Sequence, residues 1–374
     1  MPAHSPRLIA GLAMLCLGFF DGVIGVAWLS IHQDLNVTLE SLGWVLGAVG
    51  LGSALGSAIF PLLVRSVPHL NILALCLGIQ ASVFLLAMLT SSYWMFVSLY
   101  ALRGISNGMA HAALNAFFAQ RISPQHLMNI HGGWGIGTAS AGFLTGILIA
   151  QDFGWEAVYL TGGALSLFGA SVIFFTRHNF SSLRIESPSI DAKAFRATLP
   201  IMFSVVSGAA YVGLEQGVGH WMSTVLVAVD GTNIQQAGLA TGLFWGGLTF
   251  GRFTLTRIPA TVSQMLLWAS GSVAVILCCL IVIPTHFKMI AYGAVGIAMA
   301  PMSAFILTAG ARLVPVEKRD VMMAIQILSF SVGAAVIPAA FGGLASLTFI
   351  GILPFGFVVV SLLLITSIWI TVKC

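Results

Sequence analysis

The chain consists of long apolar runs that follow one another with short polar segments between them. A helix of about 20 apolar residues is long enough to cross a bilayer. The 374 residues contain twelve runs of that length, at 8–32, 41–65, 70–90, 93–120, 128–151, 157–176, 197–227, 236–257, 264–284, 287–312, 320–345 and 347–371. Only 7% of the residues are charged, against about 25% in soluble domains. The sequence therefore predicts an all-α integral membrane protein with twelve transmembrane helices.

The basic residues indicate how the helices are oriented in the membrane. If the N-terminus is cytoplasmic, nearly all arginines and lysines fall in segments on the cytoplasmic side, and the outer segments hold Lys288 alone. Cytoplasmic loops of membrane proteins carry such an excess of Lys and Arg. We therefore expect both termini in the cytoplasm and a multi-pass protein of a plasma membrane, specifically a bacterial inner membrane. The scattered basic residues predict no nucleic-acid partner.

The longest polar stretch divides the chain into two halves. This stretch, residues 177–196, separates the sixth run from the seventh and contains several charged residues. We interpret it as a cytoplasmic linker between two six-helix bundles, 1–176 and 197–374. Residues 108–117 (GMAHAALNAF) align without a gap with residues 296–305 (GIAMAPMSAF), each in the fourth run of its half. Two six-helix repeats have the same orientation in the membrane, and such parallel pseudo-repeats are typical of the major facilitator fold.

A row of polar residues interrupts the fourth apolar run. Arg103, Asn107, His111 and Asn115 recur every four residues, so they share one face of a helix. An arginine near the hydrocarbon midplane costs about 2.5–3.5 kcal/mol on insertion scales. We expect this face to line an internal, hydrated cavity, with Arg103, Asn107 and Asn115 binding substrate. Histidine titrates near neutral pH, so His111 is a candidate proton carrier, or else a packed core histidine.

Each half also carries one acid inside an apolar run. Asp21 lies midway along the first run, and Glu215 lies inside the seventh. A buried acid near a cation can take up and release a proton when its surroundings change. We predict that both acids couple transport to protons. A structural ion pair, such as Asp21 with Arg103, is the alternative.

Five further residues are candidates for the same cavity. His131 and Trp134 lie in the fifth run, Trp245 in the eighth, and Gln326, which aligns with His131, in the eleventh. We predict that these four bind substrate, although the tryptophans could equally be packed in the core. Arg252 ends the eighth run near the cytoplasm, where it would act as a gate contact between helices. The cysteine spacing predicts no metal site.

Three stretches carry a resemblance to a known family. Residues 114–117 (LNAF), 128–137 (MNIHGGWGIG) and 211–221 (YVGLEQGVGHW) resemble major facilitator transporters related to the fucose–galactose–proton symporter group. The similarity extends over essentially the whole chain. It implies proton-coupled transport of sugars or related polar solutes by alternating access, with acids in the first and fourth helices as working residues. This chain has His111 where the relatives carry the fourth-helix acid.

We therefore expect a secondary active transporter that moves a small polar solute, a sugar or an organic metabolite, by proton symport. A proton-coupled efflux antiporter for drugs or metabolites is the alternative, favoured by the Met- and Phe-rich helices and by His111. The sequence offers neither the appended domain of a membrane sensor nor the motifs of an enzyme. We expect no cofactor, with the proton gradient as energy source, and a monomer whose partners are the solute, protons and lipid.

Overall fold

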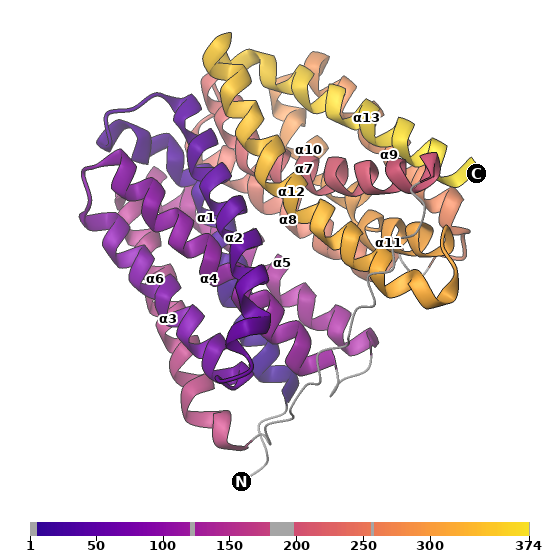
Figure 1. The fold of residues 1–374 in the computed structure, drawn as a ribbon. Helices are drawn as coiled ribbons and strands as arrows, with labels where there is room; N and C mark the ends of the chain where they lie inside the picture. The colour runs from indigo at the N-terminus through magenta and orange to yellow at the C-terminus, as the bar shows by residue number, and fades with distance from the viewer. Residues whose placement is uncertain (1–5, 120–123, 180–197, 256–257, 374) are drawn as a thin grey trace. The chain divides into compact units, whose positions relative to one another are not determined.

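The computed structural model describes residues 6–119, 124–179, 198–255 and 258–373. All regular structure in these ranges is helical, as Figure 1 shows. The α-helices are α1 (Pro6–Asp34), α2 (Leu42–Leu63), α3 (His69–Leu89), α4 (Tyr93–Ala119), α5 (Pro124–Ala150), α6 (Gly154–Thr176), α7 (Leu199–Ala228), α8 (Ile234–Thr254), α9 (Val262–Val282), α10 (Thr285–Met299), α11 (Met302–Arg312), α12 (Arg319–Leu347) and α13 (Leu353–Lys373). Within the described ranges, ten helical spans are long and apolar enough to cross a membrane.

The helices match the twelve predicted runs, with one exception. The run at 287–312 forms one candidate membrane span, Thr285–Arg312, but its helix is interrupted, because α10 ends at Met299 and α11 begins at Met302. Pro301 lies at the break. Proline has no backbone N–H to continue the helical hydrogen bonds, and its ring clashes with the preceding turn. The tenth run is therefore two shorter helices in sequence.

The chain forms two compact units, residues 1–187 and 188–374. In the first unit α1 packs mainly against α5, α2 against α4, and α3 against α6. In the second unit α7 packs against α12 and α13, α8 against α10, and α9 against α13. Most of the predicted linker, from residue 180 onward, lies outside the described residues.

Glycines bring the paired helices into backbone contact. A Cβ added to Gly104 or Gly108 of α4 would collide with the backbone of α2 at Val49 and Ser53. In the second unit, a Cβ on Gly296 of α10 would collide with the backbone carbonyl of Phe244 in α8. Small residues allow this close approach between membrane helices. Gly108 and Gly296, which align in the sequence, therefore make the same kind of contact in their units.

Lys288 is the only lysine or arginine that we expect on the outer side of the membrane. Its Nζ lies 2.6 Å from Oδ1 of Asp230, which follows the end of α7, and both side chains are mostly buried. An opposite charge at this distance offsets part of the cost of burying each group. This ion pair joins the segment after α7 to the first turns of α10.

Candidate functional site

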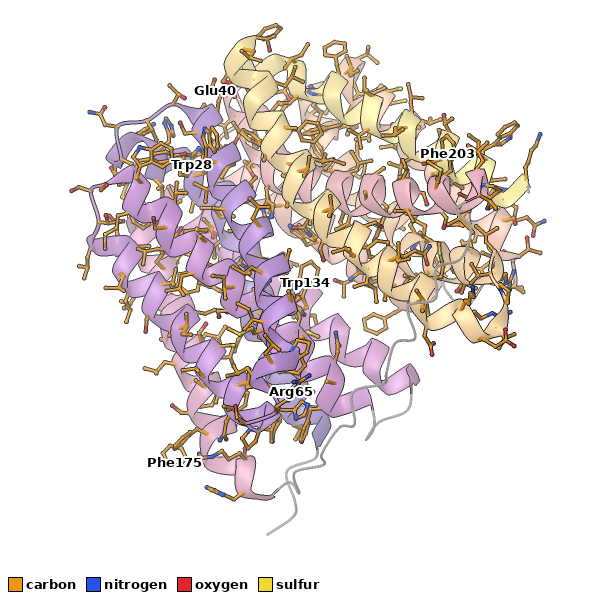
Figure 2. The ribbon with its side chains drawn as sticks, in the orientation of Figure 1. Trp28, Glu40, Arg65, Trp134, Phe175 and Phe203 are labelled. Carbon is orange, nitrogen blue, oxygen red and sulfur yellow. The ribbon has the colours of Figure 1, made fainter. Side chains whose placement is uncertain are left out.

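The first polar centre lies in unit 1 and is built around Asp21 of α1. Arg103 of α4 forms an ion pair with its Oδ1 through Nη2. Trp134 of α5, labelled in Figure 2, donates from Nε1 to its Oδ2 at 2.8 Å. The Arg103 side chain is 3% exposed, and its guanidinium lies over the ring of Phe20, 4.5 Å from the ring centroid. Two helices, α4 and α5, thus supply partners for both oxygens of the carboxylate on α1.

The close approach of α1 and α5 explains why Trp134 reaches Asp21. Gly18 and Gly22 lie one turn before Asp21 and directly after it. A Cβ on either would collide with the backbone carbonyls of α5, at Trp134 and Thr138 respectively. The two backbones are therefore in direct contact beside the carboxylate. This leaves the indole of Trp134 within hydrogen-bonding distance of Asp21.

The rest of the polar row on α4 is more accessible than Arg103. Asn107 is 9% exposed, and its Oδ1 has no hydrogen-bond partner in the part of the chain that the structure describes. His111 is partly buried, and Asn115 is exposed. Exposure thus increases along this face toward the end of α4. Arg103 is already engaged by Asp21, whereas the carbonyl of Asn107 is free to accept a further hydrogen bond.

The second polar centre lies in unit 2 and is built around Glu215 of α7. Tyr211, four residues earlier on the same helix, donates its hydroxyl to Oε2 of Glu215. Arg252 of α8 places Nη2 at 3.4 Å from the same oxygen. The Arg252 side chain is 27% exposed, whereas that of Glu215 is 6% exposed. The Arg252 side chain is therefore more exposed than that of Arg103, and this ion pair connects α7 with α8 at the residue predicted to act as a gate.

Two predicted substrate-binding residues, Trp245 and Gln326, are buried in the packing of unit 2. Trp245 is fully buried, with its ring centroid 6.3 Å from that of His220. Gln326 is also fully buried. Its Nε2 donates to Ser204 Oγ and to the backbone oxygen of Ile306, each at 2.9 Å. These bonds join α12 to α7 and α11. The side chain of His131 lies outside the described residues.

Sequence reasoning did not assign a role to Tyr211 or Phe20, which contact the charged groups directly. Tyr211 could have been found, because a residue four positions before Glu215 lies on the same helix face. Phe20 has no such signal, since its ring contacts Arg103 only through the packing of α1 against α4. Among the described residues, no group of three or more His, Cys, Asp or Glu side chains is arranged to hold a metal.

Replacing Trp134 with phenylalanine tests the hydrogen bond to Asp21. The change keeps an aromatic ring but removes the Nε1–H donor, and hydrogen bonds to charged groups contribute about 1.5–3 kcal/mol. We expect a lower melting temperature for Trp134→Phe, measured by intrinsic fluorescence of the protein in detergent. Trp94→Phe is the control, because Trp94 is 63% exposed. Equal melting temperatures for the two variants would show that the indole does not stabilise the carboxylate.

Known proteins share the family pattern of this sequence and the fold of this chain. The family model described as Major Facilitator Superfamily matches residues 10–338. A mutant of the nucleoside transporter NupG has a similar structure, with a TM-score of 0.79 and 14% sequence identity over 99% of this chain and 100% of that one. A bacterial homologue of the human lysosomal transporter Spinster, in an inward-facing and occupied conformation, has a TM-score of 0.70 and 17% identity over 100% and 95% of the two chains.

No curated protein sequence matches the chain significantly. The structural neighbours described above, at identities of 14% and 17%, bear on the fold alone. They do not single out the fucose–galactose–proton symporter group that the sequence resembles. The match over residues 10–338 covers most of the chain. Together with the membrane-length helices, it shows that this multi-pass membrane protein is a transporter belonging to the Major Facilitator Superfamily.

Proposed function

We propose that this protein is a secondary active transporter that moves a small polar solute by alternating access, coupled to proton symport. The observation that carries the proposal is that each unit pairs a buried acid with an arginine, Asp21 with Arg103 and Glu215 with Arg252. Ionisable side chains inside a membrane are expensive and usually belong to substrate or proton pathways. Asp21 and Glu215 lie on α1 and α7, which are long and apolar enough to cross a membrane, and a purely structural contact there could be made more cheaply by apolar groups.

Each pair can couple protonation to binding through simple electrostatics. Protonation of Asp21 would remove its attraction for Arg103, so the guanidinium would become available to a polar solute. Release of the proton would restore the ion pair and displace that contact. Asn107, His111 and Asn115, on the same face of α4, would supply hydrogen bonds to the solute. His111 would be a second group able to carry a proton.

We infer that the two units are parallel repeats, linked by residues 177–196, with both termini in the cytoplasm. The order of helix pairing supports the repeat, because each half pairs its first run with its fifth, its second with its fourth, and its third with its sixth. The matching backbone contacts of Gly108 and Gly296 support it as well. The distribution of basic residues supports the orientation, and a bacterial inner membrane and a monomeric state fit the same proposal.

The substrate can be sought by ligand stabilisation. A ligand that binds the folded protein raises its melting temperature in a concentration-dependent way. Sugars should be screened first because of the resemblance to the fucose–galactose–proton symporter group, and nucleosides next because a protein of similar fold is a nucleoside transporter. Uptake would appear as accumulation of the hit by cells that express the protein. Resistance to a toxic hit would instead support the efflux antiporter.

Proton coupling can then be measured in proteoliposomes with a pH-sensitive dye. With the stabilising solute outside, symport should make the outer solution more alkaline. Asp21→Asn and Glu215→Gln are expected to abolish this proton movement, because neither amide can release a proton at neutral pH. Asp152→Asn and Glu317→Gln make the same chemical changes at exposed residues and should leave it intact. Proton movement that persists in both Asp21→Asn and Glu215→Gln would contradict the assignment.

A further inference from the structure

A second group of polar atoms lies inside unit 1, between α3 and α6. Gln80 of α3 is 0% exposed and Ser166 of α6 is 1% exposed. Neither the two amide atoms of Gln80 nor the hydroxyl of Ser166 has a hydrogen-bond partner within the described ranges. Most buried amides and hydroxyls in folded proteins are bonded to protein or to ordered water, because burying them unpaired is costly. Three such atoms in two facing helices therefore require an explanation.

Two glycine contacts show how α6 is aligned with α3. A Cβ on Gly163 would lie 3.5 Å from the Cβ of Phe84, and a Cβ on Gly169 would lie 3.4 Å from Cδ1 of Leu77. Residue numbers rise along α6 as they fall along α3, so the two helices are antiparallel here. Ser166 lies three residues from each glycine, so it lies between the two contacts along α6.

Gln80 lies at the corresponding level of α3. Gln80 is three residues after Leu77 and four before Phe84, so its side chain shares their helix face. Gln80 and Ser166 therefore lie at the same level of the α3–α6 interface. The third wall of this space is α1, where Cys16 Sγ lies 3.5 Å from a backbone carbonyl of α6.

We propose that Gln80 and Ser166 bind a buried water molecule between α1, α3 and α6. Buried waters typically make about three hydrogen bonds, which matches the Nε2 and Oε1 of Gln80 and the Oγ of Ser166. A water can donate to Oε1 and Oγ while it accepts from Nε2. A direct bond between the two side chains would satisfy only one of the two amide atoms. A water molecule therefore gives all three atoms a hydrogen-bond partner, whereas the direct bond leaves one amide atom unpaired.

This water site is separate from the Asp21 centre. Neither Gln80 nor Ser166 contacts Asp21, Arg103 or Trp134 through a hydrogen bond within the described ranges, and the ring of Phe20 packs against both Phe84 of α3, 3.8 Å between centroids, and Arg103, 4.5 Å from centroid to Cζ. The site therefore does not depend on the proposed proton coupling. It can be tested on purified protein without a substrate or a proton gradient, so its failure would leave the proposed function untouched.

X-ray radiolytic labelling with mass spectrometry detects such a water, because hydroxyl radicals formed from it oxidise the buried side chains that surround it. Phe84 lies one turn from Gln80 and is the reporter. Phe96 of α4 is the internal control, since both phenylalanines are 0% exposed. We expect Phe84 to be oxidised several-fold faster than Phe96 in the native protein in lipid nanodiscs. Equal rates for the two rings would overturn the proposal without any variant.

The double variant Gln80→Met, Ser166→Ala removes all three polar atoms with little loss of volume. It should lower the oxidation of Phe84 to the rate of Phe96 while leaving Phe96 unchanged. Size-exclusion chromatography and the melting temperature establish that the variant is folded, and Ser166→Ala alone serves if it is not. Fast oxidation of Phe84 that persists in the folded variant would show that other groups hold the water, and would overturn the assignment to Gln80 and Ser166.

Discussion

Replacing Arg103 with methionine should lower the melting temperature of the protein sharply and abolish transport. The change leaves the Asp21 carboxylate buried, with the Trp134 indole as its remaining partner. Removing one member of a buried ion pair costs about 3–5 kcal/mol, because the other charge is left uncompensated. Arg319→Met should have little effect, since Arg319 is exposed. Thermal unfolding of the two variants in detergent measures the difference.

A second substitution separates the structural role of this pair from its role in transport. Combining Arg103→Met with Asp21→Asn removes both charges, so most of the lost stability should return. Proton-coupled uptake should stay absent, since the group that exchanges the proton is gone. If the double variant still moved protons with the solute, the pair would be structural only. If Arg103→Met alone melted like the native protein, the ion pair would not hold α1 and α4 together.

Adding methyl groups where α2 and α4 touch should have the second largest effect. In the double variant Gly104→Ala, Gly108→Ala, each Cβ would meet the backbone of α2. Overpacking costs about 1–3 kcal/mol at each site, and backbone atoms cannot move aside as a flexible side chain would. We expect a lower melting temperature and less folded protein in the membrane fraction, measured by fluorescence-detected size-exclusion chromatography.

The matched control should change stability in the opposite direction. Gly11 and Gly78 are also helical, but a Cβ on either would have no atom within 4 Å. Glycine inside a helix is less favourable than alanine by roughly 0.5–1 kcal/mol. The double variant Gly11→Ala, Gly78→Ala should therefore be as stable as the native protein or more stable. Equal losses in both double variants would mean that helix packing does not distinguish these glycines.

The helices and the positions of the buried acids could be predicted from the sequence, because the patterns that indicate them are local. Apolar runs of membrane length predicted twelve spans, and the positions of Asp21, Glu215 and Arg103 inside such runs identified the polar centres. The pairing of Asp21 with Arg103 was named as an alternative to a working acid, and the structure contains that pair. The substitutions of Arg103 and Asp21 described above test whether this ion pair contributes to transport.

The partners of Glu215 could not be read from the sequence. Arg252 lies 37 residues away, and its contact depends on how α7 packs against α8. Transmembrane helices are apolar on most faces, so hydrophobic periodicity does not show which face meets which neighbour. The break before Pro301 was missed for a different reason. Proline is tolerated in membrane helices, so its presence alone did not indicate that α10 would end.

By itself, the sequence determined the helical membrane fold and the positions at which polar groups enter the helices, because hydropathy and residue spacing depend on neighbours along the chain. Only the tertiary structure showed that Trp134 donates a hydrogen bond to Asp21, that Gln326 joins three helices, and that Gln80 and Ser166 are buried in neighbouring helices. Those contacts join residues far apart in the sequence. They are set by glycine-mediated backbone contacts between helices, whose partners no local pattern specifies.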